Sequence, residues 1–137
     1  MKGTIYFQYD TVNDIVIATP HWRIDSQEDC ELWLDQYVAY FSHRFDRPMD
    51  IIFVLHDFRI NSQIITAWGE YRAKLLAHYA RFYYLVHPDP IVNIASLISA
   101  LKYKNPSSEA ESIEQAIAAI QSDRVNGHPV TIRPCFQ

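Results

Sequence analysis

Ionisable side chains follow two strongly apolar segments of the sequence, where their types and spacing could support acid–base or binding chemistry. Asp57 and Arg59 come just after residues 51–55, and His87 comes directly after residues 82–86. If both segments are parallel strands, their carboxyl ends share the sheet edge at which open α/β folds bind ligands. An aspartate that orients a histidine is half of an acid–base pair, but no nucleophile accompanies these residues. An ion pair that closes the loop is the simpler interpretation, so we expect binding residues here and no enzyme.

Asn61 and Ser62 form a second candidate site, at the start of an expected helix. Backbone N–H groups and the helix dipole tolerate a phosphate at such a position, which makes Ser62 a candidate phosphoacceptor and Asn61 a candidate binding residue. The alternative is that the two residues simply begin the helix, as asparagine and serine commonly do.

The composition argues against several other kinds of site. The six histidines, at 21, 43, 56, 78, 87 and 128, show neither HxxxH nor HExxH spacing, so we expect no metal site. Only three glycines are present, too few for the glycine-rich cradles of nucleotide cofactors, and we expect no cofactor. Twelve Lys and Arg against sixteen Asp and Glu, with no basic cluster, argue against a nucleic-acid partner.

The elements that must position these residues form one domain over residues 1–137, of which 49% are hydrophobic and 20% charged. Segments 5–9 and 15–18 are β-prone and predict an N-terminal hairpin, and the continuous apolar segments 51–55 and 82–86 predict strands covered on both faces. Alternation of these strands with amphipathic helices predicts an α/β fold. We expect a mixed four- to five-stranded sheet with helices mainly on one face.

Four helices are expected, and each has a start signal. They begin at Asp25 or Ser26, at Asn61, at Pro90 behind an Asp89 cap, and after a capping box of Ser108 and Glu111. Beyond Val125 the chain should leave the helix and become extended around Val130 and Ile132. The third helix should bury the apolar stripe of Ile91, Ile94, Ala95, Ile98 and Leu101.

Aromatic residues predict two contact surfaces. Trp33 lies off the apolar stripe of the first helix and could form an exposed patch with Tyr40 for a partner helix or a dimer. His21, Trp22 and Arg23, just after the second strand, are a candidate contact loop.

Three short motifs, together with the order of the elements, resemble the STAS domain, the fold of the sporulation anti-sigma-factor antagonists. Residues 53–62 resemble the family's strand and Asp-Ser pair, with Asn61-Ser62 in place of Asp-Ser, and residues 85–90 resemble its polar turn before the third helix. Residues 112–117 resemble its Ser-Leu-Glu-Glu-Ala segment. Gln63 and Ile64 replace the glycine usual beside the serine. A second relative is the STAS branch grouped with Sec14-like lipid carriers, whose members often lack the phosphorylated serine.

This resemblance implies a non-enzymatic regulatory or protein-binding module. The alternative is a small-molecule or lipid carrier, with a pocket between helices and sheet lined by residues such as Trp68 and Tyr71. We therefore expect a protein partner, and leave open a lipid or small-molecule ligand and a homodimer. No signal peptide or membrane span is visible, and Cys30 and Cys135 form no CxxC motif. A cytoplasmic, reduced protein is expected, with a bridge between the two cysteines as the alternative.

Overall fold

The structure, a computed structural model, describes residues 3–126. Strands β1 (Thr4–Asp10) and β2 (Ile15–Ile24) pair antiparallel and confirm the N-terminal hairpin. The carboxylate of Asp10 accepts hydrogen bonds from the backbone N–H groups of Val12 and Asn13, which closes the connecting loop. Self-contained bonding of this kind is the reason that Asp and Asn favour turns.

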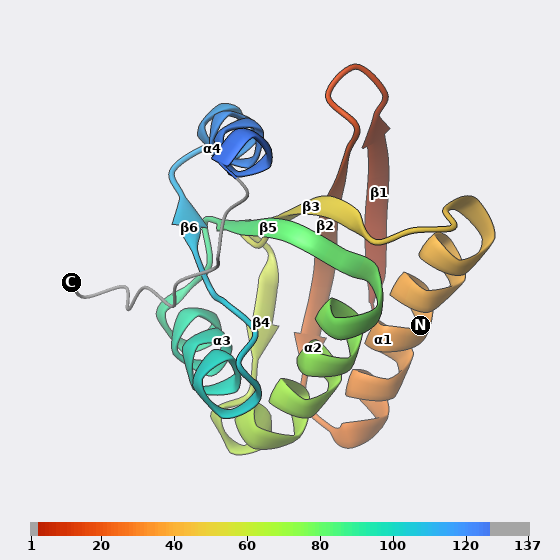
Figure 1. The fold of residues 1–137 in the computed structure, drawn as a ribbon. Coiled ribbons are helices and arrows are strands. Elements are labelled where there is room, and N and C mark those ends of the chain that lie inside the picture. The colour runs from red at the N-terminus through yellow and green to blue at the C-terminus, as the bar shows by residue number, and fades with distance from the viewer. Residues whose placement is uncertain (1–2, 127–137) are drawn as a thin grey trace.

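A six-stranded mixed sheet forms the centre of the fold (Figure 1). It contains β3 (Met49–Val54), β5 (Ala80–Val86) and β6 (Glu109–Ala110) in the order β1-β2-β3-β5-β6, while β4 (Phe58–Ile60) pairs with the second half of β2. Every pairing outside the hairpin is parallel. All six residues of β3 are buried, as a continuous apolar segment predicts. The predicted mixed α/β sheet is confirmed. Strands β4 and β6 were not predicted, because they are too short to show the alternation of apolar and polar residues that is typical of a strand.

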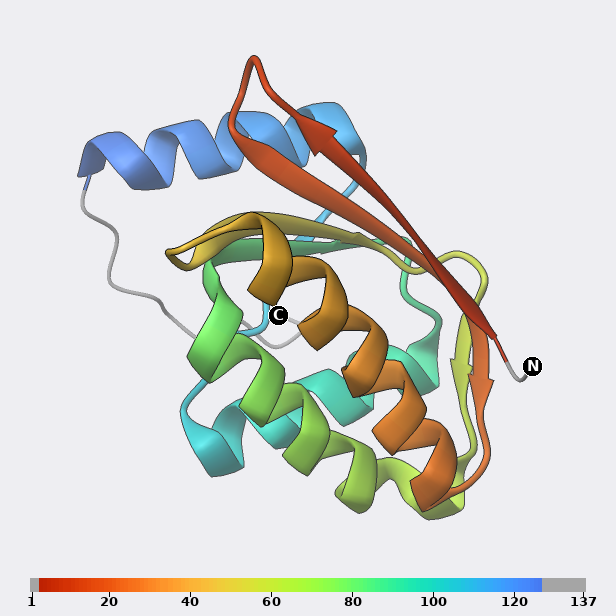
Figure 2. The same ribbon diagram turned by 90° about the vertical axis from the view of Figure 1, so that its right-hand side faces the viewer.

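Three helices cover one face of the sheet and a fourth covers the other (Figures 1 and 2). Helices α1 (Gln27–Arg44), α2 (Ile65–Tyr79) and α3 (Pro90–Tyr103) lie side by side, with α2 in the middle. Helix α4 (Ile113–Asn126) packs alone on the opposite face, where Ala116 and Ile120 meet Ile15, Ile52 and Tyr84. Within residues 3–126 no helix combines the length and the apolar character needed to cross a membrane.

Most of the predicted helix starts are confirmed. Ser26 caps α1, and Asp89 caps α3 ahead of Pro90. The start of α4 is a correction, because the capping box predicted for Ser108 and Glu111 does not begin it. Instead the hydroxyl of Ser112 accepts from the N–H of Gln115, and the Gln115 side chain accepts from the N–H of Glu111. Helix α4 also continues through Val125 to Asn126, and the extended segment predicted around Val130 and Ile132 lies outside the described residues.

The apolar stripe predicted for α3 is largely wrong, because Ala95 is buried as expected but the four larger residues of the stripe are exposed. Ile94 and Ile98 are each 48% exposed and Leu101 is 62% exposed, whereas Ser96 and Ser99 are buried. The reason is the close approach of α2. The hydroxyl of Ser99 donates to the carbonyl of Gly69 at 2.8 Å, and a Cβ added to Gly69 would lie only 3.2 Å from the Cβ of Ser99. Only small side chains fit between the two helices.

The exposed aromatic patch predicted around Trp33 and Tyr40 is also wrong. Trp33 is only 3% exposed, and its ring lies 5.6 Å from that of Trp68 on α2. Tyr40 stacks on Phe7 of β1 at 4.1 Å and is half-buried. Helix α1 is buried over a wide face because the sheet and α2 contact it from two sides.

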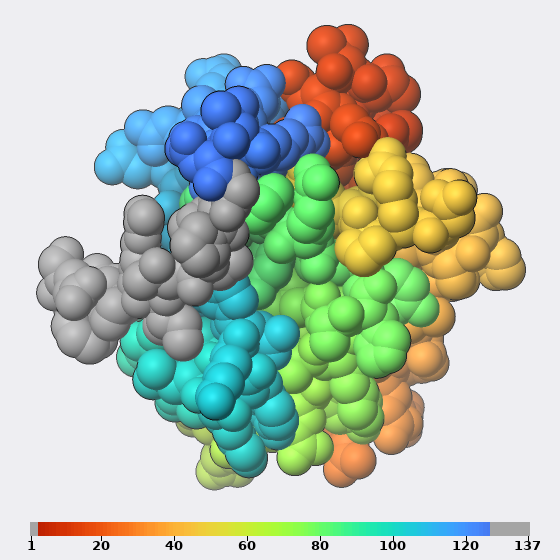
Figure 3. All heavy atoms as spheres, in the orientation of Figure 1, coloured from red at the N-terminus to blue at the C-terminus, as the bar shows by residue number. Residues whose placement is uncertain are grey.

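A buried aspartate joins α4 to the sheet. Asp50 of β3 accepts hydrogen bonds from the side chains of Arg81 and Arg124 and from the backbone N–H of Phe82. The Arg124 guanidinium also donates to the carbonyls of Asn13 and Asp14, so the end of α4 lies against the hairpin loop (Figure 3). Burial alone would raise the pKa of the Asp50 carboxyl, but these hydrogen bonds outweigh it and hold the pKa below its ordinary value.

Candidate functional site

A surface hollow of about 280 Å³ lies where the carboxyl ends of β2 and β4 meet the first turns leading into α2 and α3. Such an edge is the usual ligand position of open α/β sheets. The residues that line it are Arg23, Arg59, Ile60, Asn61, Ser62, Asp89 and Ile91.

Asn61 fixes the backbone that presents Ser62. Its N–H donates to the carbonyl of Ile24 at 2.8 Å, which ties this turn to the end of β2. Its side chain accepts from the N–H of Gln63, and so caps a 3₁₀ turn, η1 (Ser62–Ile64), that continues directly into α2. Ser62 is the first residue of that turn and is exposed to solvent. The helix start predicted at Asn61 is confirmed.

Arg59 and Asp89 connect the two helix starts. The Arg59 guanidinium lies 3.3 Å from a carboxylate oxygen of Asp89, and it also donates to the carbonyls of His56 and Phe58. The other carboxylate oxygen of Asp89 accepts from the N–H of Val92 in the first turn of α3. Arg59 therefore holds its own loop and positions Asp89, which agrees with the ion-pair interpretation of this segment.

Asp57 pairs with His21, and not with Arg59 or His87, the residues that the sequence pattern groups with it. Its carboxylate contacts Nδ1 of His21 at 2.7 Å, and both side chains are about half exposed or more. The hydrogen bond from His21 holds the pKa of Asp57 below its ordinary value. The contact exists because β2 and β4 pair in the register Trp22 with Phe58, which places His21 beside Asp57.

His87 lies in the turn between β5 and α3, with its backbone in the left-handed region at φ 56°. It is exposed and, like Asp57, is not among the residues that line the hollow. Of the predicted site residues, the structure therefore brings together Arg59, Asn61 and Ser62.

Two charged residues of the hollow, Arg23 and Asp89, were not predicted as part of this site. Arg23 was predicted only as part of a contact loop of His21, Trp22 and Arg23, and that prediction is wrong, because β2 continues through Ile24 and Trp22 is buried. The Arg23 side chain is 69% exposed and lies 3.0 Å from the carboxylate of Asp25. Asp89 was predicted only as a helix cap. The sequence does indicate the polar turn of residues 85–90 that contains Asp89. The pairing of Asp89 with Arg59, however, depends on β4, a strand that the sequence does not reveal.

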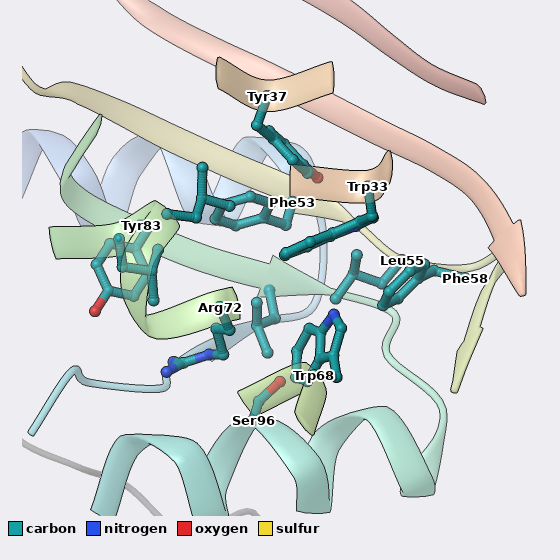
Figure 4. Close-up of a pocket in the computed structure, with 12 residues that line it drawn as sticks. Trp33, Tyr37, Phe53, Leu55, Phe58, Trp68, Arg72, Tyr83 and Ser96 are labelled. Atoms are coloured by element: carbon teal, nitrogen blue, oxygen red, sulfur yellow. The ribbon is translucent and has the colours of Figure 1, made fainter. Parts of the chain in front are cut away.

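An interior cavity of about 30 Å³ lies between the helices and the sheet (Figure 4). Trp33 and Tyr37 of α1, Trp68 of α2 and Ser96 of α3 converge on it, and the polar atom of each has no hydrogen-bond partner within residues 3–126. Arg72, 4% exposed, also lines it, and burial lowers the pKa of that guanidinium to about 10. The cavity is where the carrier hypothesis places its pocket, with Trp68 in the lining but not Tyr71.

Metal-ligating side chains and the thiol of Cys30 are the remaining groups that could carry chemistry. In the described range, no three His, Cys, Asp or Glu side chains are grouped so that they could hold a metal ion. Cys30 is a free, buried thiol, and burial raises its pKa to about 11, which keeps it protonated and unreactive at neutral pH. Cys135 lies outside the described residues.

Comparisons with known proteins agree with this architecture. No family model matches the chain, and no curated protein matches it in sequence. Among solved structures, the chain is similar to the anti-sigma factor antagonist SpoIIAA in its unphosphorylated form, with 19% sequence identity and a TM-score of 0.50. The match covers 92% of this chain and 99% of that chain. At this identity the similarity concerns the fold, and the chain has the fold of a STAS domain.

Proposed function

We propose that the protein is a regulatory module that binds another protein at the hollow around Ser62 and releases it when Ser62 is phosphorylated. The observation that carries this proposal is the exposed Ser62 hydroxyl, at the first turn leading into α2, in a hollow also lined by Arg23 and Arg59. The likeness to an anti-sigma factor antagonist supports a regulatory, non-enzymatic role.

The charges of the hollow suit a serine that gains a phosphate. Arg23 and Arg59 now pair with Asp25 and Asp89; the Arg23–Asp25 pair is exposed, whereas the Asp89 side chain is only 24% exposed. An exposed ion pair contributes only about 0–1 kcal/mol, so Arg23 can turn to a dianionic phosphate at little cost. Arg59, held by the carbonyls of His56 and Phe58, adds positive charge from its present position. A partner seated on Ser62 would instead meet a new charge that it must desolvate. Asp57 and His87, outside the hollow, are proposed as contacts at its rim.

Mutation of Ser62 tests the proposal. Ser62→Asp should abolish recovery of the protein partner in a pull-down, while Ser62→Ala should recover it as the wild type does. The thermal melt of Ser62→Asp should hardly change, because an acid near a helix N-terminus is stabilised by roughly 0.3–1 kcal/mol.

Ser42→Asp is the matched control, because Ser42 is an exposed serine on α1, far along the chain from the hollow. It should leave recovery unchanged. Phosphopeptide mapping of protein purified from its own host should find phosphate on Ser62. Equal recovery with all four proteins, together with an unmodified Ser62, would contradict the regulatory role of this residue.

A small-molecule or lipid carrier is the second candidate, supported by the interior cavity and its four unpartnered polar atoms. We place it second because a volume of about 30 Å³ holds only about two water molecules, whereas an acyl chain is many times larger. Native mass spectrometry of the freshly purified protein should give the mass of the polypeptide alone. A co-purifying lipid that is lost on replacing Trp68 by alanine would reverse this order.

A further inference from the structure

The outer side of α3 carries an apolar stripe that nothing in the described structure covers. Helix α3 lies at one edge of the three-helix layer, next to α2 and on the opposite side of it from α1 (Figure 2). Ten large hydrophobic side chains are exposed among the described residues, and four of them lie on this helix. The four, which we call the α3 stripe, are Ile91, Ile94, Ile98 and Leu101, exposed by 38%, 48%, 48% and 62%.

The spacing of the α3 stripe is that of a helix–helix contact. Its residues are separated by three, four and three positions, which is the a/d pattern of a seam between two helices. At a rise of 1.5 Å per residue the seam is about 15 Å long, which matches roughly three turns of a second helix. Single exposed aliphatic residues need no explanation, but a continuous row of four at this spacing indicates an interaction surface.

The α3 stripe is continuous with the hollow that contains Ser62. Ile91, its first residue, also lines that hollow. At the other end, Lys102 and Lys104 are exposed and form no ion pair with a described residue. Near the first half of α3, Asp89 is paired with Arg59, whereas Glu109 is hydrogen-bonded to the neutral side chain of Asn93 and keeps its negative charge. The unpaired charge at the C-terminal end of the stripe is therefore positive.

Area argues against a second copy of this chain as the occupant. A stable dimer buries about 800 Å² on each partner through some 20–30 residues, far more than four aliphatic side chains on one helix provide. The net charge of −4 argues against an anionic membrane, because two lysines do not offset it. A short helix of a different protein fits the length, the spacing and the charge.

We propose that α3 docks an amphipathic helix of a protein partner, with apolar side chains along the α3 stripe and acidic residues opposite Lys102 and Lys104. This extends the proposed function, since the same partner would reach the Ser62 hollow through Ile91. The contact is transient, because its apolar area is small. Binding of a helix along α3 does not require phosphorylation, so it can be tested separately from the switch.

Two synthetic peptides of about 18 residues, long enough to form a helix, test the surface on the full chain. Both carry leucines at three- and four-residue spacing; one has glutamates in its first turn, and the other has lysines there. In an NMR titration the acidic peptide should shift the backbone amide signals of α3 and of the hollow. The basic peptide should bind at least tenfold more weakly.

Variants of exposed residues decide the outcome. Ile98→Asp should abolish the shifts, whereas Leu32→Asp, which alters an aliphatic residue 40% exposed on α1, should leave them intact. Both variants should melt like the wild type, and Ile94→Ser provides a milder second test. Shifts that miss α3, or that survive Ile98→Asp, would overturn the proposal. The proposal would also be overturned if the wild type formed a dimer, or bound phosphatidylglycerol vesicles, and Ile98→Asp abolished that association.

Discussion

Replacing Asp50 by asparagine should lower the free energy of unfolding by about 2–3 kcal/mol at neutral pH, the cost of losing a charged hydrogen-bond acceptor at a buried site. The Asp50 side chain is 1% exposed and accepts from Arg81, Arg124 and the backbone of Phe82. Because Arg81 is half exposed, water recovers part of its interaction, which keeps the expected loss at this level. Urea unfolding of the variant beside the wild type measures it.

The same carboxylate predicts a pH dependence with a definite sign. Its pKa is lowered in the folded state, so the unfolded chain binds a proton more readily. The stability that Asp50 contributes is therefore complete above the unfolded value of about 4 and is lost as the pH falls through the lower, folded value. The difference between the wild type and Asp50→Asn should be constant from neutral pH down to about pH 5 and should shrink below pH 4.

Asp35→Asn is the matched control for both measurements, since Asp35 is exposed on α1. It should leave the unfolding free energy within about 0.5 kcal/mol of the wild type. Arg124→Met should lose part of the same stability, because it removes the bonds to Asp50 and to the hairpin loop. An Asp50→Asn protein as stable as the wild type would show that this cluster is held by the packing of α4 alone.

The central strand β3 was predictable because its residues leave few alternatives. Residues 51–55 are aliphatic and aromatic without a break, and only a strand covered on both faces buries such a segment within so few residues. The helix starts were predictable for a similarly local reason, because Ser26, Asn61 and Asp89 satisfy backbone N–H groups within three residues of themselves.

The parts of the site that escaped prediction depend on contacts between distant segments. The pair of His21 with Asp57 requires β2 to extend far enough to meet β4, a three-residue strand that has no pattern of its own. The meeting of Arg59 with Asp89 likewise requires the first turn of α3 to lie beside that strand. Spacing along the chain carries no information about such neighbours.

The buried face of α3 was predicted wrongly because the neighbouring helix α2 approaches it closely. Hydrophobic periodicity assumes that the most apolar face of a helix is buried. Here the neighbour is a helix whose Gly69 allows a close approach, and the contact selects Ala95, Ser96, Ser99 and Ala100 on grounds of size. The aliphatic side chains are displaced to the outer surface, where they form the α3 stripe.

Two adjacent substitutions should therefore give the opposite results to those that the periodicity of α3 predicts. Ser99→Leu should destabilise the fold by about 3 kcal/mol, because it overfills the contact with Gly69 and removes the hydroxyl bonded to the Gly69 carbonyl and to Arg72. Ile98→Ser, at a residue 48% exposed, should change the unfolding free energy by less than about 1 kcal/mol. Thermal melts of the two variants beside the wild type provide the comparison.

Ser99→Ala separates the two causes of the expected loss. It removes the hydroxyl but adds no volume, so it should cost only the hydrogen bonds, about 1–2 kcal/mol, and should fall between the other two variants. If Ile98→Ser instead proved the most damaging change, the isoleucines would be buried and the proposed docking surface would not exist. The order Ser99→Leu, Ser99→Ala, Ile98→Ser thus tests both the packing of α3 and the availability of its outer face for a partner.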